Sequence, residues 1–361
     1  MATQLPLHEL HARLGARFGE ADGHLLPLDY GSPSAEHEAV RERVGLTDRS
    51  HRGKIAATGR DRVSFLQGML SNDVKALGPG QGCPAAFLDA HGKIVSLLVA
   101  HALPDRILLE TDALLVRPTL EALDRLLISE RVELEDASAA EGILTFAGPA
   151  ARKTVEGLLG QALPDLGLYH HARAGVDGLE LHVVRTAESG EDGYDLWAPV
   201  GALAPLWERA IGAGVRPVGR EAWNVLRVEA GVVWYGVDVD ASTLLLEAPL
   251  EQTYSLTKGC YVGQEVVARI TYRGHVNRKI VGFSFPDGRI PAAGAAVSVE
   301  GREVGRITSP VVSPALGRGL ALGFLRREHW APGTKVEVAG AGGALTAEVA
   351  ALPFHRRAAE R

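Results

Sequence analysis

The stretch Thr257–Arg269 reads TKGCYVGQEVVAR and places Cys260, one of only two cysteines in 361 residues, between a lysine and two glycines. The thiolate is the nucleophilic and metal-binding form of cysteine, and a nearby cation or a helix N-terminus stabilises it. Lys258 lies two residues upstream, and we expect a helix to begin just after Gly263. We therefore predict that Cys260 is a functional thiol. An inert cysteine, buried in a tight turn, is the alternative.

This segment also resembles a known family. KGCYVGQE (residues 258–265), followed by Arg269, is similar to the signature of the YgfZ proteins. These proteins bind folate and are related to the aminomethyltransferase, or T protein, of the glycine cleavage system. T proteins usually keep the lysine and both glycines but lack the cysteine and the Gln-Glu pair. The resemblance implies that Cys260 and Lys258 are the working groups. The further motif residues are Gly259, Tyr261, Gly263, Gln264, Glu265 and Arg269.

Composition bounds the class of protein. A chain of 361 residues with 46% hydrophobic and 23% charged residues is long enough for two or three folded domains. Its net charge of −6 comes from interleaved acidic and basic residues, which argues against a nucleic-acid partner. No apolar run is long enough for a membrane span, and the N-terminus lacks the apolar core of a signal peptide. We expect a cytoplasmic protein.

The two cysteines exclude a disulfide framework and cannot supply the four thiolates of an iron–sulfur cluster within one chain. The thirteen histidines show no metal-ligand spacing, so we expect no resident metal. Cys83 precedes a proline at the start of an apolar stretch and has no basic neighbour in the sequence. We predict that it is structural.

The pattern of apolar residues indicates an α+β architecture of sheets with helices packed on them. We expect helices at 5–19 and at 34–44, the second capped by Ser34, and a hairpin at 82–103. Six short alternating stretches after Arg278 predict a small β-barrel. The resemblance implies the T-protein fold over the whole chain. The expected domains are 1–277, with subdomains of about 1–140 and 141–277, and 278–361, which comprises the barrel and a tail.

One departure from the T-protein pattern bears on activity. In T proteins the second arm of the 82–103 hairpin usually carries an Asp-Asp pair, one member of which faces the reactive nitrogen of folate. The matching residues here are Ser96 and Leu97. Neither side chain can exchange a proton with an amine as a carboxylate does. The departure argues against ordinary glycine-cleavage chemistry and leaves open whether the chain is an enzyme.

The resemblance also implies a set of folate-binding residues. Glu191, in GEDGYD, matches a glutamate that pairs with the pterin ring, although the segment alone indicates an exposed hairpin tip. Arg227, in LRVEAG, is a candidate for the glutamyl carboxylate of folate, because guanidinium pairs with carboxylate in a bidentate manner. An ion-pair network with Glu229 is the alternative. Tyr235 and Asp238 belong to the same expected cavity, and Asp238 could instead cap a turn.

These observations support one main hypothesis and two alternatives. The main one is a cytoplasmic protein that binds tetrahydrofolate or a one-carbon derivative and supports the assembly or repair of iron–sulfur proteins. Its partners would be folate and iron–sulfur client or assembly proteins, with no nucleic acid and no membrane. The alternatives are a folate-dependent aminomethyltransferase of the glycine-cleavage type, and a folate-responsive binding protein without chemistry.

Overall fold

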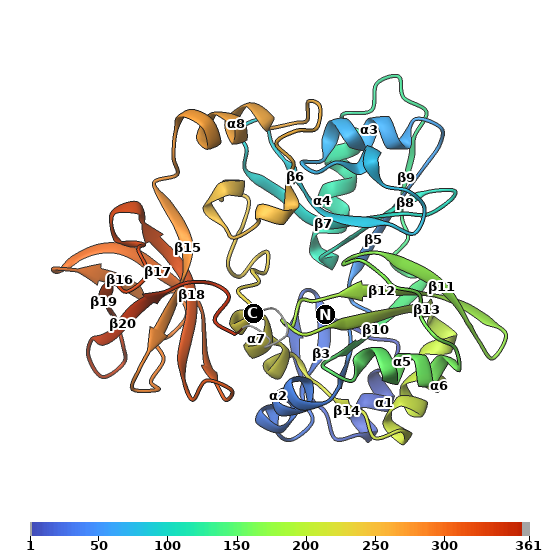
Figure 1. The fold of residues 1–361 in the computed structure, drawn as a ribbon, viewed down its shortest axis with the longest axis horizontal. Helices are drawn as coiled ribbons and strands as arrows, with labels where there is room; N and C mark the ends of the chain where they lie inside the picture. Colours follow the sequence, from blue (N-terminus) through green and yellow to red (C-terminus); the bar gives the residue numbers. More distant parts are fainter. Residues whose placement is uncertain (1, 356–361) are drawn as a thin grey trace.

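The computed structural model describes residues 2–355, which form two sheet-and-helix parts and a β-barrel (Figure 1). Of the short basic tail that the sequence shows, His355-Arg356-Arg357, the two arginines lie outside the described residues. The α+β fold with a C-terminal barrel is confirmed. No helix within residues 2–355 is long and apolar enough to cross a membrane.

The first part contains a six-stranded sheet and a small N-terminal sheet. The strands of the large sheet, in spatial order, are β11 (His171–Val176), β12 (Leu179–Thr186), β13 (Gly193–Pro199), β10 (Glu141–Ala147), β4 (Gly45–Asp48) and β14 (Arg216–Pro217). Helices α5 (Ala151–Leu159) and α6 (Val200–Gly212) bury their apolar sides against this sheet. The remaining elements are β1 (Thr3–Gln4), α1 (His8–Arg13), β2 (Arg17–Ala21), β3 (His24–Asp29), α2 (Pro33–Glu42) and α7 (Arg220–Glu229).

The second part is a five-stranded sheet with helices α3 (Arg62–Met69) and α4 (Ala113–Asp124) packed on it. Its strands, in spatial order, are β6 (Gly82–Leu88), β7 (Ile94–Ala102), β8 (Ile107–Thr111), β5 (Gly53–Thr58) and β9 (Glu133–Asp136). The short helix η1 (Val74–Ala76) follows α3. Helices η2 (Leu245–Glu247), η3 (Glu251–Thr253) and α8 (Gln264–Arg273) lead from α7 to the barrel.

The barrel closes with strand order β15-β18-β17-β16-β19-β20. The bounds are β15 (Arg278–Phe285), β16 (Ala296–Val299), β17 (Arg302–Ser313), β18 (Arg318–Arg326), η4 (Arg327–His329), β19 (Lys335–Val338) and β20 (Leu345–Ala350). Inward-facing side chains such as Phe283, Ile307 and Val338 are buried and form a core of their own. The figure shows the barrel to one side of the other two parts.

Three details differ from the sequence-based expectations. Strand β4 pairs with β10, so residues 45–48 belong to the sheet of the later strands, although the expected subdomains grouped them with residues 1–140. Helix α1 ends at Arg13 instead of continuing to residue 19, because Gly15 adopts a left-handed φ of 80° and a strand follows. Ser32 rather than Ser34 caps α2, since its side chain accepts a hydrogen bond from the Ala35 N–H.

Candidate functional site

A cavity of about 360 Å³ lies between the two sheet-and-helix parts, and Pro353 and His355 of the C-terminal segment also line it. That volume falls in the range of small-molecule sites. One wall is apolar and includes Ala85, Leu97 and Val99 from the β6–β7 hairpin. The lining also includes Val232, Trp234 and other residues that follow α7. A smaller hollow of about 50 Å³ adjoins it and shares Arg49, Arg52, Asp112, Glu188, Trp234 and Tyr235.

Ion pairs form the polar side of this cavity. Arg49 pairs with Glu188 at 2.7 Å, and Arg52 donates a hydrogen bond of 2.8 Å to Glu110. Arg52 also pairs with Asp112. Burial alone would raise the pKa of Glu110, but Arg52 and Arg49 overcome that effect and hold the pKa at about 2. Glu110 is therefore an ionised group at neutral pH rather than a proton donor.

Asp195, on β13, is a cavity carboxyl group whose pKa burial raises, as burial also raises the pKa of Asp112. Thr145 donates a hydrogen bond of 2.6 Å to its Oδ1, and no residue within 2–355 donates one to its Oδ2. Burial raises the pKa of Asp195 to about 6; Arg49 opposes this shift, and Glu110 adds to it. Asp195 can therefore accept hydrogen bonds from a ligand at neutral pH.

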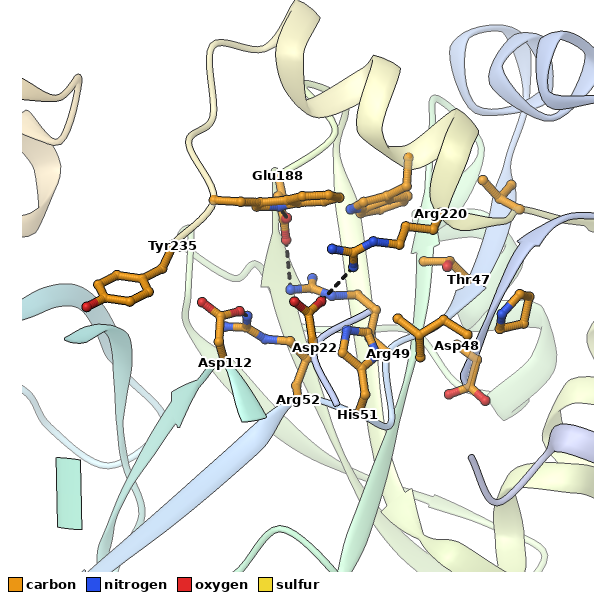
Figure 2. A pocket seen from close by; sticks show the side chains of 15 residues that line it. Asp22, Thr47, Asp48, Arg49, His51, Arg52, Asp112, Glu188, Arg220 and Tyr235 are labelled. Carbon is orange, nitrogen blue, oxygen red and sulfur yellow. Dashed lines mark hydrogen bonds and ion pairs between the residues drawn. The ribbon is translucent and has the colours of Figure 1, made fainter. Parts of the chain in front are cut away.

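The smaller hollow combines guanidinium groups with two indole rings, as Figure 2 shows. Arg220 pairs with Asp22 at 2.7 Å, and its guanidinium carbon lies 4.4 Å from the ring centre of Trp234. The indole N–H of Trp234 donates a hydrogen bond of 2.8 Å to Glu188. Tyr235 lines both spaces.

Tyr169 lines the cavity and has an unusual backbone conformation. Tyr169 adopts a φ of 64°, an uncommon conformation for a residue with a side chain, and lines the cavity. Its carbonyl group packs against Gly82, where a Cβ atom would lie only 2.5 Å from the carbonyl oxygen. Such strained residues cluster at functional sites. Nothing in the sequence around Tyr169 indicated this role.

The adjacent residues Ser96 and Leu97 point in different directions, and only Leu97 lines the cavity. Ser96 is buried, and its hydroxyl lies 3.0 Å from the hydroxyl of Thr111, so it points into the sheet rather than into the cavity. Leu97 lines the cavity. The position expected to face a ligand therefore presents a hydrocarbon side chain.

Three of the four residues predicted to bind folate do not line the cavity. Glu191 pairs with Arg41 at 2.8 Å. Arg227 is fully buried and donates hydrogen bonds to Asp238, Ser309, Asn224 and the carbonyl of Val232. Asp238 also accepts hydrogen bonds from the hydroxyls of Thr308 and Ser309, which fasten this loop to the barrel. These contacts correct the expectation that the three side chains meet the ligand directly. The sequence reasoning missed Asp195, which lines the cavity, and Arg220, which lines the smaller hollow; both belong to the same segments.

The residues of the KGCYVGQE motif lie outside the cavity. Cys260 is exposed, whereas Lys258 is buried and donates hydrogen bonds to the carbonyls of Gln67, Leu70 and Asn72. Burial lowers the pKa of Lys258 to about 8, and Asp73 opposes that shift. The ammonium thus caps the C-terminal end of α3 instead of serving as a free cation beside Cys260.

The rest of the motif anchors this loop. Tyr261 is buried against the Lys258 ammonium, which lies 5.0 Å from its ring centre. Gly263 precedes α8 with a φ of 82°, and a Cβ atom there would lie 2.6 Å from the carbonyl oxygen of Asp89. Gln264 begins α8, as predicted, while Glu265 and Arg269 are exposed on it. Gly259 has open space around it.

Cys83 is half-buried, and the fold gives it a basic neighbour that the sequence did not reveal. Burial raises the pKa of Cys83 to about 11, with a smaller opposing effect from Lys258. Its thiol is therefore protonated at neutral pH. Within residues 2–355, no group of three or more histidine, cysteine or acidic residues is arranged to hold a metal ion.

Two family models match this chain, one over the region before the barrel and one over the barrel. Residues 7–258 match the GCVT N-terminal domain, and residues 278–355 match the glycine cleavage T-protein C-terminal barrel domain. The aminomethyltransferase of Rubrobacter xylanophilus is 35% identical over 98% of this chain and 94% of its own length. That of Geobacillus kaustophilus is 34% identical over 99% of this chain and 100% of its own length.

Among solved structures, the glycine cleavage system aminomethyltransferase T from Bartonella henselae matches with a TM-score of 0.91. It is 27% identical, and the match covers 98% of each chain. The fold, the two-domain match and the similar relatives agree with each other. The chain belongs to the glycine cleavage T-protein family.

Proposed function

We propose that this protein binds tetrahydrofolate, or a one-carbon derivative of it, in the central cavity and supports the assembly or repair of iron–sulfur proteins through Cys260. Aminomethyltransferase T proteins use tetrahydrofolate as the one-carbon acceptor, and the cavity has a suitable size and lining. The pterin ring presents an amide N–H and an exocyclic amine side by side. Asp195 is the carboxylate that would accept both hydrogen bonds.

The observation that carries this proposal is Leu97 on the cavity wall. Aminomethyl transfer needs a group that exchanges a proton with, or stabilises positive charge on, the reacting nitrogen. In T proteins that group is an acid on this hairpin, and here the side chain is a hydrocarbon. A cavity that keeps the fold and its ion pairs but lacks this acid suits binding of folate better than transfer.

The role of Cys260 follows from its position. The thiol is exposed and does not line the cavity, so it would act on something other than the bound folate. The similarity of KGCYVGQE to the YgfZ signature supports an iron–sulfur protein as that partner. The buried Lys258 and Tyr261 keep the loop in place while Cys260 faces outward.

Three measurements test the proposal. Calorimetry should detect binding of tetrahydrofolate to the purified protein, and incubation with an aminomethyl-lipoyl donor should give no methylene-tetrahydrofolate above the uncatalysed rate. In a deletion strain, iron–sulfur enzyme activities should be restored by the wild-type chain and not by Cys260→Ser. Transfer at the rate of a T protein would contradict the proposal, as would full rescue by Cys260→Ser.

A second candidate is aminomethyl transfer itself. The full-length similarity to proteins named aminomethyltransferase favours it. Asp195 is the group that could replace the missing acid, because burial raises its pKa to about 6. In that case the transfer assay should give product, and Asp195→Asn should abolish it.

A further inference from the structure

The segment that carries Cys260 has two sides with different properties. Lys258, Tyr261 and Val267 are buried and hold it against α3 and the β6–β7 hairpin. Val267 is the only buried residue of α8, so most of this ten-residue helix lies at the surface. Figure 1 shows α8 at the periphery of the molecule, between the hairpin and the barrel.

The outward side carries side chains that are typical of protein interfaces. Tyr272 on α8 is 68% exposed, and Leu256, on the loop before Cys260, is 41% exposed. Glu265, Arg269 and Tyr272 follow one another at spacings of four and three residues, so they share one side of the helix. Tyrosine and arginine are enriched among residues that dominate binding energy in protein interfaces.

Four exposed arginines without ion pairs in the described part of the chain lie on α8 or beside the segment that follows it. Arg269, Arg273, Arg326 and Arg327 are exposed, and none of them forms an ion pair within residues 2–355. The strand pairing of Arg278 with Arg326, and the hydrogen bond from Arg327 N–H to the carbonyl of Asn277, hold the two barrel arginines beside the segment that leaves α8. Glu265 and Glu328 are the exposed acidic residues nearby in the sequence. We call Arg269, Arg273, Arg326 and Arg327 the basic face.

The basic face is positively charged, whereas the whole chain has a net charge of −6. Elsewhere in the molecule arginines are commonly paired, as in Arg41 with Glu191 at 2.8 Å. Unpaired charges at the rim of an interface steer a partner of opposite charge and select against a partner of like charge. The basic face therefore suits an acidic partner.

We propose that α8 and the Cys260 loop form a docking surface for an acidic protein, which the basic face steers so that the partner's reactive group meets the thiol of Cys260. This inference rests on the proposed function for the role of Cys260, but not on folate binding. The charge of the surface and the exposure of Tyr272 exist whether or not the cavity is occupied.

The test uses the full chain with Cys83→Ala, so that Cys260 is the single thiol. Two synthetic peptides of equal length each carry one cysteine as a 2-thiopyridyl disulfide; glutamates flank it in one peptide and lysines in the other. The Cys260 thiolate attacks the peptide sulfur, the old S–S bond breaks, a new mixed disulfide forms, and pyridine-2-thione leaves with its absorbance as the signal. We expect the glutamate peptide to react about tenfold faster at low salt. The difference should shrink at high salt, because the Debye length falls from about 30 Å at 0.01 M to about 8 Å at 0.15 M.

Charge reversal supplies the control. Arg269→Glu with Arg273→Glu should abolish or invert the preference, while Arg302→Glu, at an exposed site on the barrel, should leave it unchanged. Neutral 2,2′-dithiodipyridine should react equally with all variants, which shows that the thiol and the fold are intact.

Equal rates for the two peptides would overturn the proposal, and so would an unchanged preference after charge reversal. Arginine-dependent binding to phosphatidylserine vesicles or to single-stranded RNA, without any peptide preference, would likewise overturn it. Calorimetry with tetrahydrofolate on the same variants tests the cavity separately.

Discussion

The Lys258 ammonium donates a hydrogen bond of 2.5 Å to the carbonyl oxygen of Leu70, directly after the end of α3. The same nitrogen donates to the carbonyls of Gln67 and Asn72 at 2.6 and 3.0 Å. A lysine in the most distinctive motif of the chain thus holds together two segments that are almost 190 residues apart, as the separations of 186 to 191 positions show. Its effect is on the position of the Cys260 loop.

Lys258→Met should therefore destabilise the fold. Removal of the ammonium leaves three carbonyl groups without their donor, and each unsatisfied buried polar group costs about 1–3 kcal/mol. We expect a loss of at least ~2 kcal/mol in the free energy of unfolding, measured by urea denaturation. Lys75→Met, an exposed lysine on η1, is the matched control and should change stability by less than ~0.5 kcal/mol. A stable Lys258→Met protein would mean that the lysine acts chemically and not structurally.

A second prediction distinguishes Glu191 from Asp195, two of the three carboxylates of the GEDGYD segment. Asp195→Asn should weaken tetrahydrofolate binding at least tenfold, because an amide cannot accept two hydrogen bonds from adjacent ligand N–H groups with the same charge assistance. Glu191→Gln should bind folate almost normally but lose stability, since Glu191 pairs with the buried Arg41. Calorimetry and thermal unfolding on both variants decide. The reverse pattern would restore Glu191 as the pterin ligand.

The pH dependence of binding gives a third prediction. The pKa of Asp195 is about 6, so the carboxylate that accepts the ligand's hydrogen bonds is lost as the pH falls through that value. Affinity should be nearly constant above pH 7 and should fall by up to tenfold for each pH unit below 6. His101 also lines the cavity, but burial lowers its pKa to about 4, so it stays neutral over this range.

The matching measurement is calorimetry with 5-formyltetrahydrofolate between pH 5 and 8. Asp195→Asn should bind weakly with a flat pH profile. If the variant kept the wild-type profile, another group would be responsible for the pH dependence.

The sequence predicted the fold more completely than it predicted the residues of the candidate site. Local patterns located α8 after Gly263, the 82–103 hairpin and the six barrel strands, because turn glycines and alternating apolar residues determine these elements over short distances. The pairing of β4 with β10 joins positions about 100 residues apart, and no local pattern encodes it.

The same reason explains the errors at the site. Asp195 lies within β13 and lines the cavity, whereas Glu191 precedes the strand and pairs with Arg41, a contact that no local pattern shows. A clue was available for Asp195, since alternation along GYDLW puts every second side chain on one face of the sheet. Arg227 and Arg220 differ by seven positions on one helix, and the contacts of Arg227 with the barrel are visible only in three dimensions.

The last prediction concerns the two thiols, which should differ sharply in reactivity. Thiolate is the reactive form, and the pKa of Cys83 is about 11, so at pH 8 about one Cys83 in a thousand is ionised. Cys83 is also half-buried on β6, whereas Cys260 is exposed. Iodoacetamide at pH 8 should therefore label native protein at Cys260 at least a hundredfold faster than at Cys83, as read by mass spectrometry of the digested chain. In urea the two rates should become similar, because unfolding removes the burial that raises the pKa of Cys83.

Cys83→Ala should leave folate binding and the labelling of Cys260 unchanged. Rapid labelling of Cys83 in the native protein would show that its strand opens readily, and slow labelling of Cys260 would contradict its assignment as the thiol presented to a partner.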